Sequence, residues 1–253
     1  MEIDKMKVIA HRGASGEFAE NSLLAFEQAL IQGCDAIEFD VQFHQPSSEF
    51  ILLHDSYLKI IDINGSNHGE EKVHFNQVPL DELIHTSPNA KYNICTLVQA
   101  LQCINIQCQI NIELKSATQG AQLANEMQKL EAVIRHAQAR KLITFQQLVI
   151  SSFNHHALVY VANHFPEMTT AALIACCPIN YAEFCQQLKV NMLNLSIECM
   201  NPEIIKDAHR RGLKVWVYTV DHPDQIKQCL DFQVDGIFTN FPLRTRQTIS
   251  ALT

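Results

Sequence analysis

Three acidic residues occupy alternating positions in two strand-like stretches of the sequence. The stretch AIEFDV contains Glu38 and Asp40, and the stretch NIELK contains Glu113. Side chains alternate between the faces of a strand, so Glu38 and Asp40 share one face and the apolar residues beside them take the other. Crowded carboxylates raise each other's pKa unless a cation intervenes. The pattern therefore favours a divalent-metal site for Mg²⁺ or Ca²⁺, which prefer oxygen ligands, over simple pairing with lysine or arginine.

Two histidines stand directly after apolar runs. His11 follows VIA and precedes Arg12, and His54 follows ILL and precedes Asp55. Imidazoles exchange protons near neutral pH, and a guanidinium binds phosphate oxygens in a fork. Together with a metal, these groups indicate phosphoryl chemistry, with His11 and His54 as acid–base candidates.

The elements that must position these residues alternate regularly between strand-like and helix-like stretches. The eight apolar runs are Val8–Ala10, Ala36–Val41, Gln109–Leu114, Leu148–Ser151, Thr170–Ala175, Met192–Leu195, Leu213–Thr219 and Gly236–Thr239. A helix candidate follows each run, and several begin at explicit start signals such as Asn201-Pro202. This alternation predicts an α/β fold, a closed (β/α)8 TIM barrel, with an open doubly wound sheet as the alternative. No GxGxxG fingerprint follows the first run, which disfavours a dinucleotide-binding version of the open sheet.

Residues 1–253 are therefore expected to form a single domain, interrupted by an insertion at about residues 42–93 between the second strand and its helix. In such a barrel the active site lies at the carboxyl ends of the strands, where the acidic residues and His11 fall. Trp216 and Tyr218 share one strand face, and Tyr218, which is nearer the carboxyl end, is the better candidate for lining a substrate.

Bulk composition limits the partners. The net charge of −8 disfavours nucleic acid or an anionic membrane surface as the main partner. No apolar run is long enough to cross a bilayer, and the N-terminus lacks the layout of a signal peptide, so we expect a cytoplasmic protein without stable membrane association. The nine cysteines include no CxxC pair, and they are expected to be buried, reduced thiols. The sequence leaves the oligomeric state open.

The order of the motifs resembles the glycerophosphodiester phosphodiesterase family. The stretches that carry the resemblance are AHRGASGEFAENSLLAFEQAL, GCDAIEFDV, ILLHD, NIELK, VISSFN, AHRRGLKVWVYTVD and VDGIFTNFP, and they extend from about Val8 to Pro242. Each motif is weak by itself, but their order over nearly the whole chain is specific.

The resemblance implies a metal-dependent barrel hydrolase that converts glycerophosphodiesters to glycerol 3-phosphate and an alcohol. It implies an acid–base pair, a set of metal ligands and two phosphate-binding cations. These are respectively His11 and His54; Glu38, Asp40 and Glu113; and Arg12 and Lys115. By resemblance alone, His11 is the base and His54 the acid. Whether water or the neighbouring glycerol hydroxyl attacks stays open.

The chain departs from the family pattern in several places. The common WTVN is replaced by Tyr218-Thr219-Val220-Asp221, TDxP by Thr239-Asn240-Phe241-Pro242, and PENT by AENS. We expect these changes to lie at the substrate-facing rim and to alter alcohol specificity rather than the reaction. The alternatives are a lysophospholipase D-type enzyme acting on lysophospholipids and an inactive ligand-binding barrel.

Overall fold

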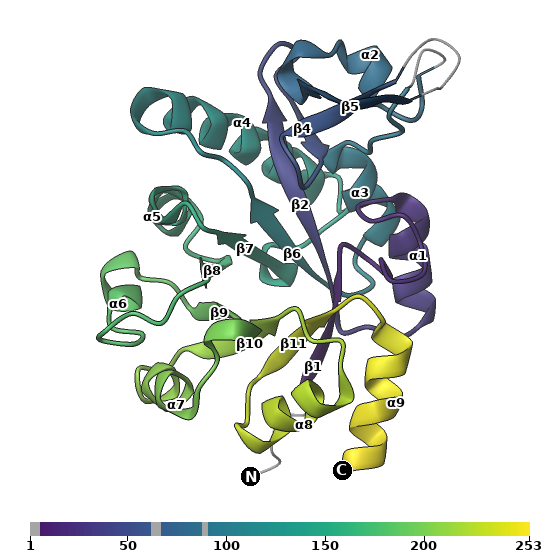
Figure 1. Ribbon diagram of the computed structural model, residues 1–253. Coiled ribbons are helices and arrows are strands. Elements are labelled where there is room, and N and C mark those ends of the chain that lie inside the picture. Colours follow the sequence, from purple (N-terminus) through teal and green to yellow (C-terminus); the bar gives the residue numbers. More distant parts are fainter. Residues whose placement is uncertain (1–5, 62–66, 88–90) are drawn as a thin grey trace.

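The computed structural model describes residues 6–61, 67–87 and 91–253. Within these ranges, eight parallel strands close into a barrel, and helices surround it (Figure 1). In spatial order the strands are β1 (Lys7–His11), β2 (Ala36–His44), β6 (Gln109–Leu114), β7 (Leu148–Ser152), β8 (Thr169–Ile174), β9 (Met192–Ser196), β10 (Lys214–Tyr218) and β11 (Gly236–Thr239). Because β1 pairs with both β2 and β11, the sheet is closed and the predicted TIM barrel is confirmed.

A helix follows each barrel strand, as the alternation predicted. These helices are α1 (Leu23–Ile31), α3 (Leu97–Ile104), α4 (Gly120–Ala139), α5 (His155–His164), α6 (Phe184–Leu188), α7 (Pro202–Arg210), α8 (Pro223–Asp231) and α9 (Pro242–Leu252). Their starts follow from the sequence: the side chain of Asn201 accepts hydrogen bonds from two backbone N–H groups of α7, and Thr96 and Gln99 form a capping box at α3.

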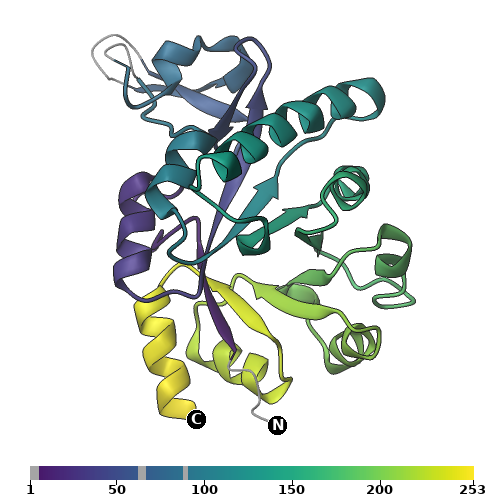
Figure 2. The same cartoon turned by 180° about the vertical axis from the view of Figure 1, so that it is seen from behind.

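The segment between β2 and α3 forms a small structure of its own beyond the carboxyl end of β2 (Figure 1, and from behind in Figure 2). Its elements are β3 (Glu49–Leu52), β4 (Tyr57–Ile61), β5 (Asn67–His74), η1 (Phe75–Gln77) and α2 (Leu80–Leu83). Strand β3 pairs antiparallel with the last residues of β2, with Val41 opposite Leu52. That turn returns the chain to the barrel rim and places His54 there.

A plug of side chains fills the lumen below the carboxyl ends of the strands. Its buried members are Ile9, Ala36, Val149, Ala171, Met192, Trp216 and Phe238. The indole of Trp216 needs a glycine opposite, since a Cβ on Gly236 would lie 2.7 Å from Trp216 Cδ1. The plug therefore leaves only the upper part of the lumen for polar side chains.

The nine cysteines all lie in the described ranges and are free, but the expectation that they are buried is only partly correct. Cys95, Cys185 and Cys229 are buried, whereas Cys176 and Cys177 are exposed in the loop after β8, where the chain leaves the sheet. No helix among the described residues is long and apolar enough to cross a membrane. Residues 1–5, on which the signal-peptide expectation partly depends, lie outside the described ranges.

Candidate active site

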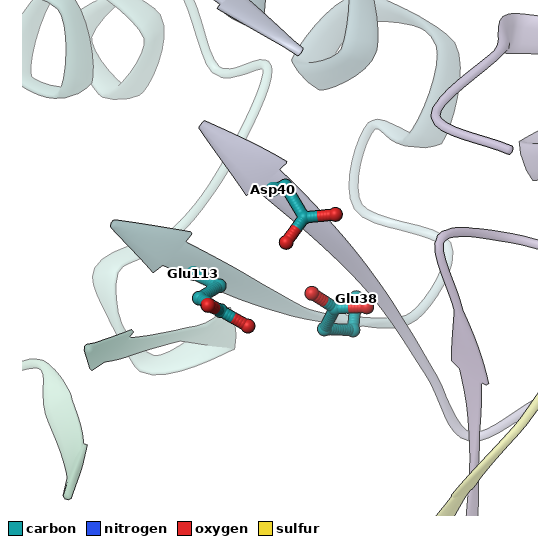
Figure 3. A group of neighbouring side chains, drawn as sticks. All are labelled: Glu38, Asp40 and Glu113. Atoms are coloured by element: carbon teal, nitrogen blue, oxygen red, sulfur yellow. The ribbon is translucent and has the colours of Figure 1, made fainter. Parts of the chain in front are cut away.

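The three predicted carboxylates meet in the upper lumen. Glu38 and Asp40 project from β2, and Glu113 projects from β6, where it is the register partner of Asp40. Figure 3 shows the three side chains pointing toward one another, and each offers an oxygen within 4.8 Å of the others. Glu38 and Asp40 are 2% and 1% exposed, so bulk water hardly solvates either group. The alternation of the two strands thus produces the convergence predicted from the sequence.

This crowding changes how readily the carboxyl groups ionise. Burial, together with repulsion from Asp40 and Glu113, raises the pKa of Glu38 well above its ordinary value. Burial and repulsion from Asp40 likewise raise the pKa of Glu113. A bound cation would reverse both effects, because it favours the ionised form of each neighbour.

The unsatisfied oxygens around this cluster fit a cation. Glu38 Oε2 accepts a hydrogen bond from the backbone N–H of Arg12 at 2.9 Å, but Glu38 Oε1 is buried and has no hydrogen-bond partner in the described chain. The same holds for Asn111 Oδ1, whose amide nitrogen donates to Ser151. Both residues line a cavity of about 20 Å³ that Glu113 also borders. Oxygen acceptors around a small hole suit a hard divalent ion.

Two fixed cations border the carboxylates. Arg12 Nε lies 2.9 Å from Asp40 Oδ2, and Lys115 Nζ lies 3.0 Å from Glu113 Oε1 and 3.5 Å from Asp40 Oδ1. Burial opposes the charge on each of them, but the neighbouring carboxylates outweigh burial, so the pKa values of Arg12 and Lys115 are raised. Both side chains are therefore firmly cationic where a phosphate would approach the cluster.

Asn21 belongs to this cluster although the sequence reasoning did not assign it a role. Its side chain donates to Asp40 Oδ2 at 3.0 Å and accepts from the backbone N–H of Asp40 at 3.2 Å. Asn21 adopts a left-handed backbone conformation, with φ of 55°, in the loop before α1. The motif AENS, which retains this asparagine, was the available signal. Its two hydrogen bonds hold Asp40 in place.

The two predicted acid–base histidines have different surroundings. His11 ends β1 and borders the small cavity, and burial, with the charge of Arg12, lowers its pKa. His54 lies at the rim, where its side chain is 37% exposed and its Nδ1 lies 2.8 Å from Asp55 Oδ1. His54 is close enough to Glu113 to favour the ionised form of that carboxyl group. The neutral ring is thus favoured at His11, whereas the ring of His54 has a carboxylate partner.

One departure from the family pattern, Asn240, contacts His11, and a second, Asp221, contacts Asn240, which corrects their expected place at the rim. Asn240 Oδ1 lies 2.8 Å from His11 Nδ1, and Asn240 Nδ2 donates to Asp221 Oδ2 at 2.6 Å. The sequence did not predict this contact, because the loops after β10 and β11 fold over the end of β1. Asp221 and Asn240 therefore belong to the surroundings of an acid–base candidate.

Tyr218 lies where strand alternation placed it. It packs against the lumen plug above Trp216, borders the small cavity with His11 and Glu38, and donates its hydroxyl proton to the carbonyl of Ile174 at 2.8 Å. Burial raises the pKa of Tyr218, so its hydroxyl stays protonated. Its ring forms a wall of the lumen opposite the carboxylates.

Comparison with known proteins identifies the family to which this chain belongs. The profile of the glycerophosphoryl diester phosphodiesterase family matches residues 11–244. The chain belongs to this family. It is 28% identical over 247 residues to a glycerophosphodiester phosphodiesterase of Caldanaerobacter subterraneus, covering 94% of this chain and 95% of that one.

Solved structures of other phosphodiesterases have the same fold as this chain. A phosphodiesterase of Oleispira antarctica, solved in complex with the product sn-glycerol 3-phosphate, superposes with a TM-score of 0.79 at 23% identity, covering 96% of each chain. A glycerophosphodiester phosphodiesterase of Parabacteroides distasonis superposes with a TM-score of 0.79 at 23% identity, covering 98% of each chain. The family match and the relative from Caldanaerobacter subterraneus identify the chain as an enzyme of the phosphodiesterase class. All eight residues predicted for its site fall within the matched range.

Proposed function

We propose that this enzyme hydrolyses glycerophosphodiesters to glycerol 3-phosphate and an alcohol, with a divalent metal and a pair of histidines. The observation that carries the proposal is the cluster of Glu38, Asp40 and Glu113, with Arg12 and Lys115 against its carboxylates. The partner is thus a small-molecule phosphodiester. We also propose that residues 1–253 act as one catalytic domain and that residues 42–93 are an insertion that supplies His54.

Glu38, Asp40 and Glu113 would hold the metal, and their oxygen-only set favours Mg²⁺ or Ca²⁺. When bound, such an ion supplies Lewis-acid stabilisation of the charge that develops on the phosphoryl oxygens. Asn21 keeps the Asp40 carboxylate oriented toward the other two. The raised pKa values of Glu38 and Glu113 support this assignment, because burial and mutual repulsion at these carboxylates outweigh the positive charge of Arg12 and Lys115.

The remaining steps use side chains of the chain itself. Arg12 and Lys115 would bind the phosphate oxygens and neutralise their charge in the transition state. His11 Nε2 would accept a proton from the nucleophile, which is water or the neighbouring glycerol hydroxyl. His54 would donate a proton to the oxygen of the leaving alcohol. The lowered pKa of His11 supports its role as the base, because the ring is then neutral at physiological pH.

The decisive experiment is an assay of purified enzyme against a panel of glycerophosphodiesters. After treatment with a chelator, activity should vanish, and the separate addition of Mg²⁺, Ca²⁺ and Zn²⁺ should restore it most strongly with one of the hard ions. Glycerol 3-phosphate should be released from every hydrolysed substrate. If no diester of the panel is hydrolysed with any of the ions, the proposal is wrong and an inactive ligand-binding barrel is the better description.

A lysophospholipase D-type activity is the second candidate, and one observation favours it. A recess of about 250 Å³ adjoins His54, and its lining is mainly apolar, including Leu53, Leu58, Tyr92 and Ile94. The acyl chain of a lysolipid stays on the glycerol, and a chain that extends out of the lumen past His54 would find apolar contacts there. Comparison of glycerophosphocholine with lysophosphatidylcholine at equal concentration separates the two activities. Faster turnover of the lysolipid would make it the preferred substrate class.

A further inference from the structure

Asn240 lies between a carboxylate and the imidazole of the proposed base. Its side-chain nitrogen donates to Asp221 Oδ2 at 2.6 Å, and its backbone N–H donates to Asp221 Oδ1 at 2.8 Å. Its side-chain oxygen lies 2.8 Å from His11 Nδ1. Thr239 Oγ1 also donates to Asp221 Oδ1 at 2.8 Å, so the carboxylate receives three hydrogen bonds. The side chains of Asp221, Asn240 and His11 thus form a hydrogen-bonded chain that leads to the lumen.

The donors and acceptors of this chain determine the protonation of the ring. An ionised carboxylate only accepts hydrogen bonds, so Asp221 must face the amide nitrogen of Asn240 and not its oxygen. The amide oxygen then faces His11, and because it also only accepts, His11 Nδ1 must carry the proton. In the neutral ring this leaves the lone pair on Nε2. Ser15 Oγ lies 2.9 Å from the same amide oxygen and 2.6 Å from the backbone carbonyl of His11, so its one proton is shared between two acceptors and the orientation of the amide is set by Asp221.

We propose that Asp221, acting through Asn240, is a positioning residue that holds His11 in the tautomer protonated at Nδ1, with Nε2 free to accept a proton. The carboxylate and the amide act as a matched pair whose members can be exchanged. The family pattern WTVN and TDxP has asparagine at the first of these positions and aspartate at the second, and this chain has the reverse. The catalytic part of the inference rests on the proposed function, whereas the tautomer does not depend on it.

The exchange can be followed one hydrogen bond at a time. With Asn240→Asp alone, two carboxylates stand 2.6 Å apart where an amide donor met an acceptor. In the wild type, Asn240 and Thr239 donate to both carboxylate oxygens of Asp221. With Asp221→Asn alone, one of these oxygens is replaced by an NH₂ group, which is a donor and cannot accept, so one donor faces another donor. With both changes, the amide at 221 donates to the carboxylate at 240, and that carboxylate accepts from His11 Nδ1. Every donor meets an acceptor again.

Nitrogen-15 NMR of the imidazoles at pH 8, in protein labelled at histidine, tests the tautomer directly. The His11 resonances are identified by their loss in a His11→Gln variant. We expect protonation at Nδ1 in the wild type and in the double variant Asp221→Asn/Asn240→Asp, and a mixture of tautomers in Asp221→Asn. Protonation of the wild-type ring at Nε2 would overturn the inference, whether or not the enzyme hydrolyses glycerophosphodiesters.

A double-mutant cycle in kcat is the second readout. We expect each single substitution to lower kcat about 10- to 100-fold with less than about a threefold change in KM, since misplacing the tautomer of a catalytic histidine is costly. The double variant should recover to within about fivefold of the wild type, which a merely structural role would not produce. Asp224→Asn makes the same chemical change at a side chain that is 93% exposed and is the control. A double variant as slow as the slower single variant, with wild-type thermal stability, contradicts the exchange.

Discussion

Arg12 Nε lies 2.9 Å from Asp40 Oδ2, so a side chain proposed to bind phosphate contacts one proposed to bind metal. The same carboxylate also lies 3.5 Å from Lys115 Nζ and accepts a hydrogen bond from Asn21. Asp40 thus connects the two cations that are proposed to bind phosphate to the other two carboxylates. Metal and phosphate are expected to bind cooperatively here. The metal compensates the charge of the carboxylates, and the phosphate compensates the charge of Arg12 and Lys115.

Replacement of His54 by alanine should remove the proposed acid without harming the fold. We expect kcat to fall by about 10²–10⁴, the usual contribution of a positioned proton donor. His54 lies at the rim and is 37% exposed, so the thermal stability should change little. His156→Ala, at an exposed position in α5, is the matched control and should keep wild-type kcat. Near-full activity of His54→Ala would exclude it as the acid.

Addition of a hard divalent ion should stabilise the folded protein. At a concentration of about 100 times Kd, binding contributes about 2.7 kcal/mol, which corresponds to a rise in Tm of about 5–10 °C for a chain of this size. Glu113→Gln should lose most of this rise, and Glu167→Gln, on the exposed loop after α5, should retain it. Differential scanning calorimetry with and without a chelator measures the effect. An equal rise in both variants would mean that the ion binds elsewhere.

The stability of the metal-free protein should depend on pH through the ionisation of Glu38. Because its pKa is raised in the folded state, the folded state binds more protons than the unfolded state above pH 4.5, the ordinary value for glutamate. Stability therefore falls as pH rises from that value toward the raised pKa. Glu38→Gln removes this loss and can still accept from the backbone N–H of Arg12.

Urea unfolding in chelator at pH 5 and pH 8 measures the difference between Glu38→Gln and wild type. At pH 8 the variant should be more stable by about 1 kcal/mol or more, since each unit of raised pKa corresponds to about 1.4 kcal/mol. At pH 5 the difference should shrink. A variant that is less stable than wild type at pH 8 would show that the carboxylate is already well compensated.

Gly236 should tolerate no side chain while Trp216 fills the lumen. Gly236→Ala places a Cβ 2.7 Å from Trp216 Cδ1 and 2.8 Å from Ile9 Cδ1, and we expect a loss of about 1–3 kcal/mol in the free energy of unfolding. In a Trp216→Leu background the same change should cost less, because the smaller side chain leaves room. Equal costs in the two backgrounds would mean that the backbone at Gly236, and not the indole, sets the limit.

The sequence predicted the barrel and the convergence of carboxylates because both follow from local alternation. Glu38, Asp40 and Glu113 sit on strands whose register follows once the barrel is known. The partner of His11 could not be predicted in this way, because Asn240 is 229 residues away in the sequence and reaches it from a loop. Strand periodicity says which face a residue takes but not how the loops at the carboxyl ends fold over one another.

The plug around Trp216 and Phe238 closes the lumen below the polar site, so the lumen is open only at the carboxyl ends of the strands. A diester would have to enter through this opening, and both products would have to leave through it before the next substrate binds. In the proposed reaction the alcohol would lie next to His54, which is 37% exposed, and would be closer to this opening than glycerol 3-phosphate bound over the carboxylates. If the proposed roles hold, the alcohol would leave first, and glycerol 3-phosphate would leave last and inhibit by competing with the substrate.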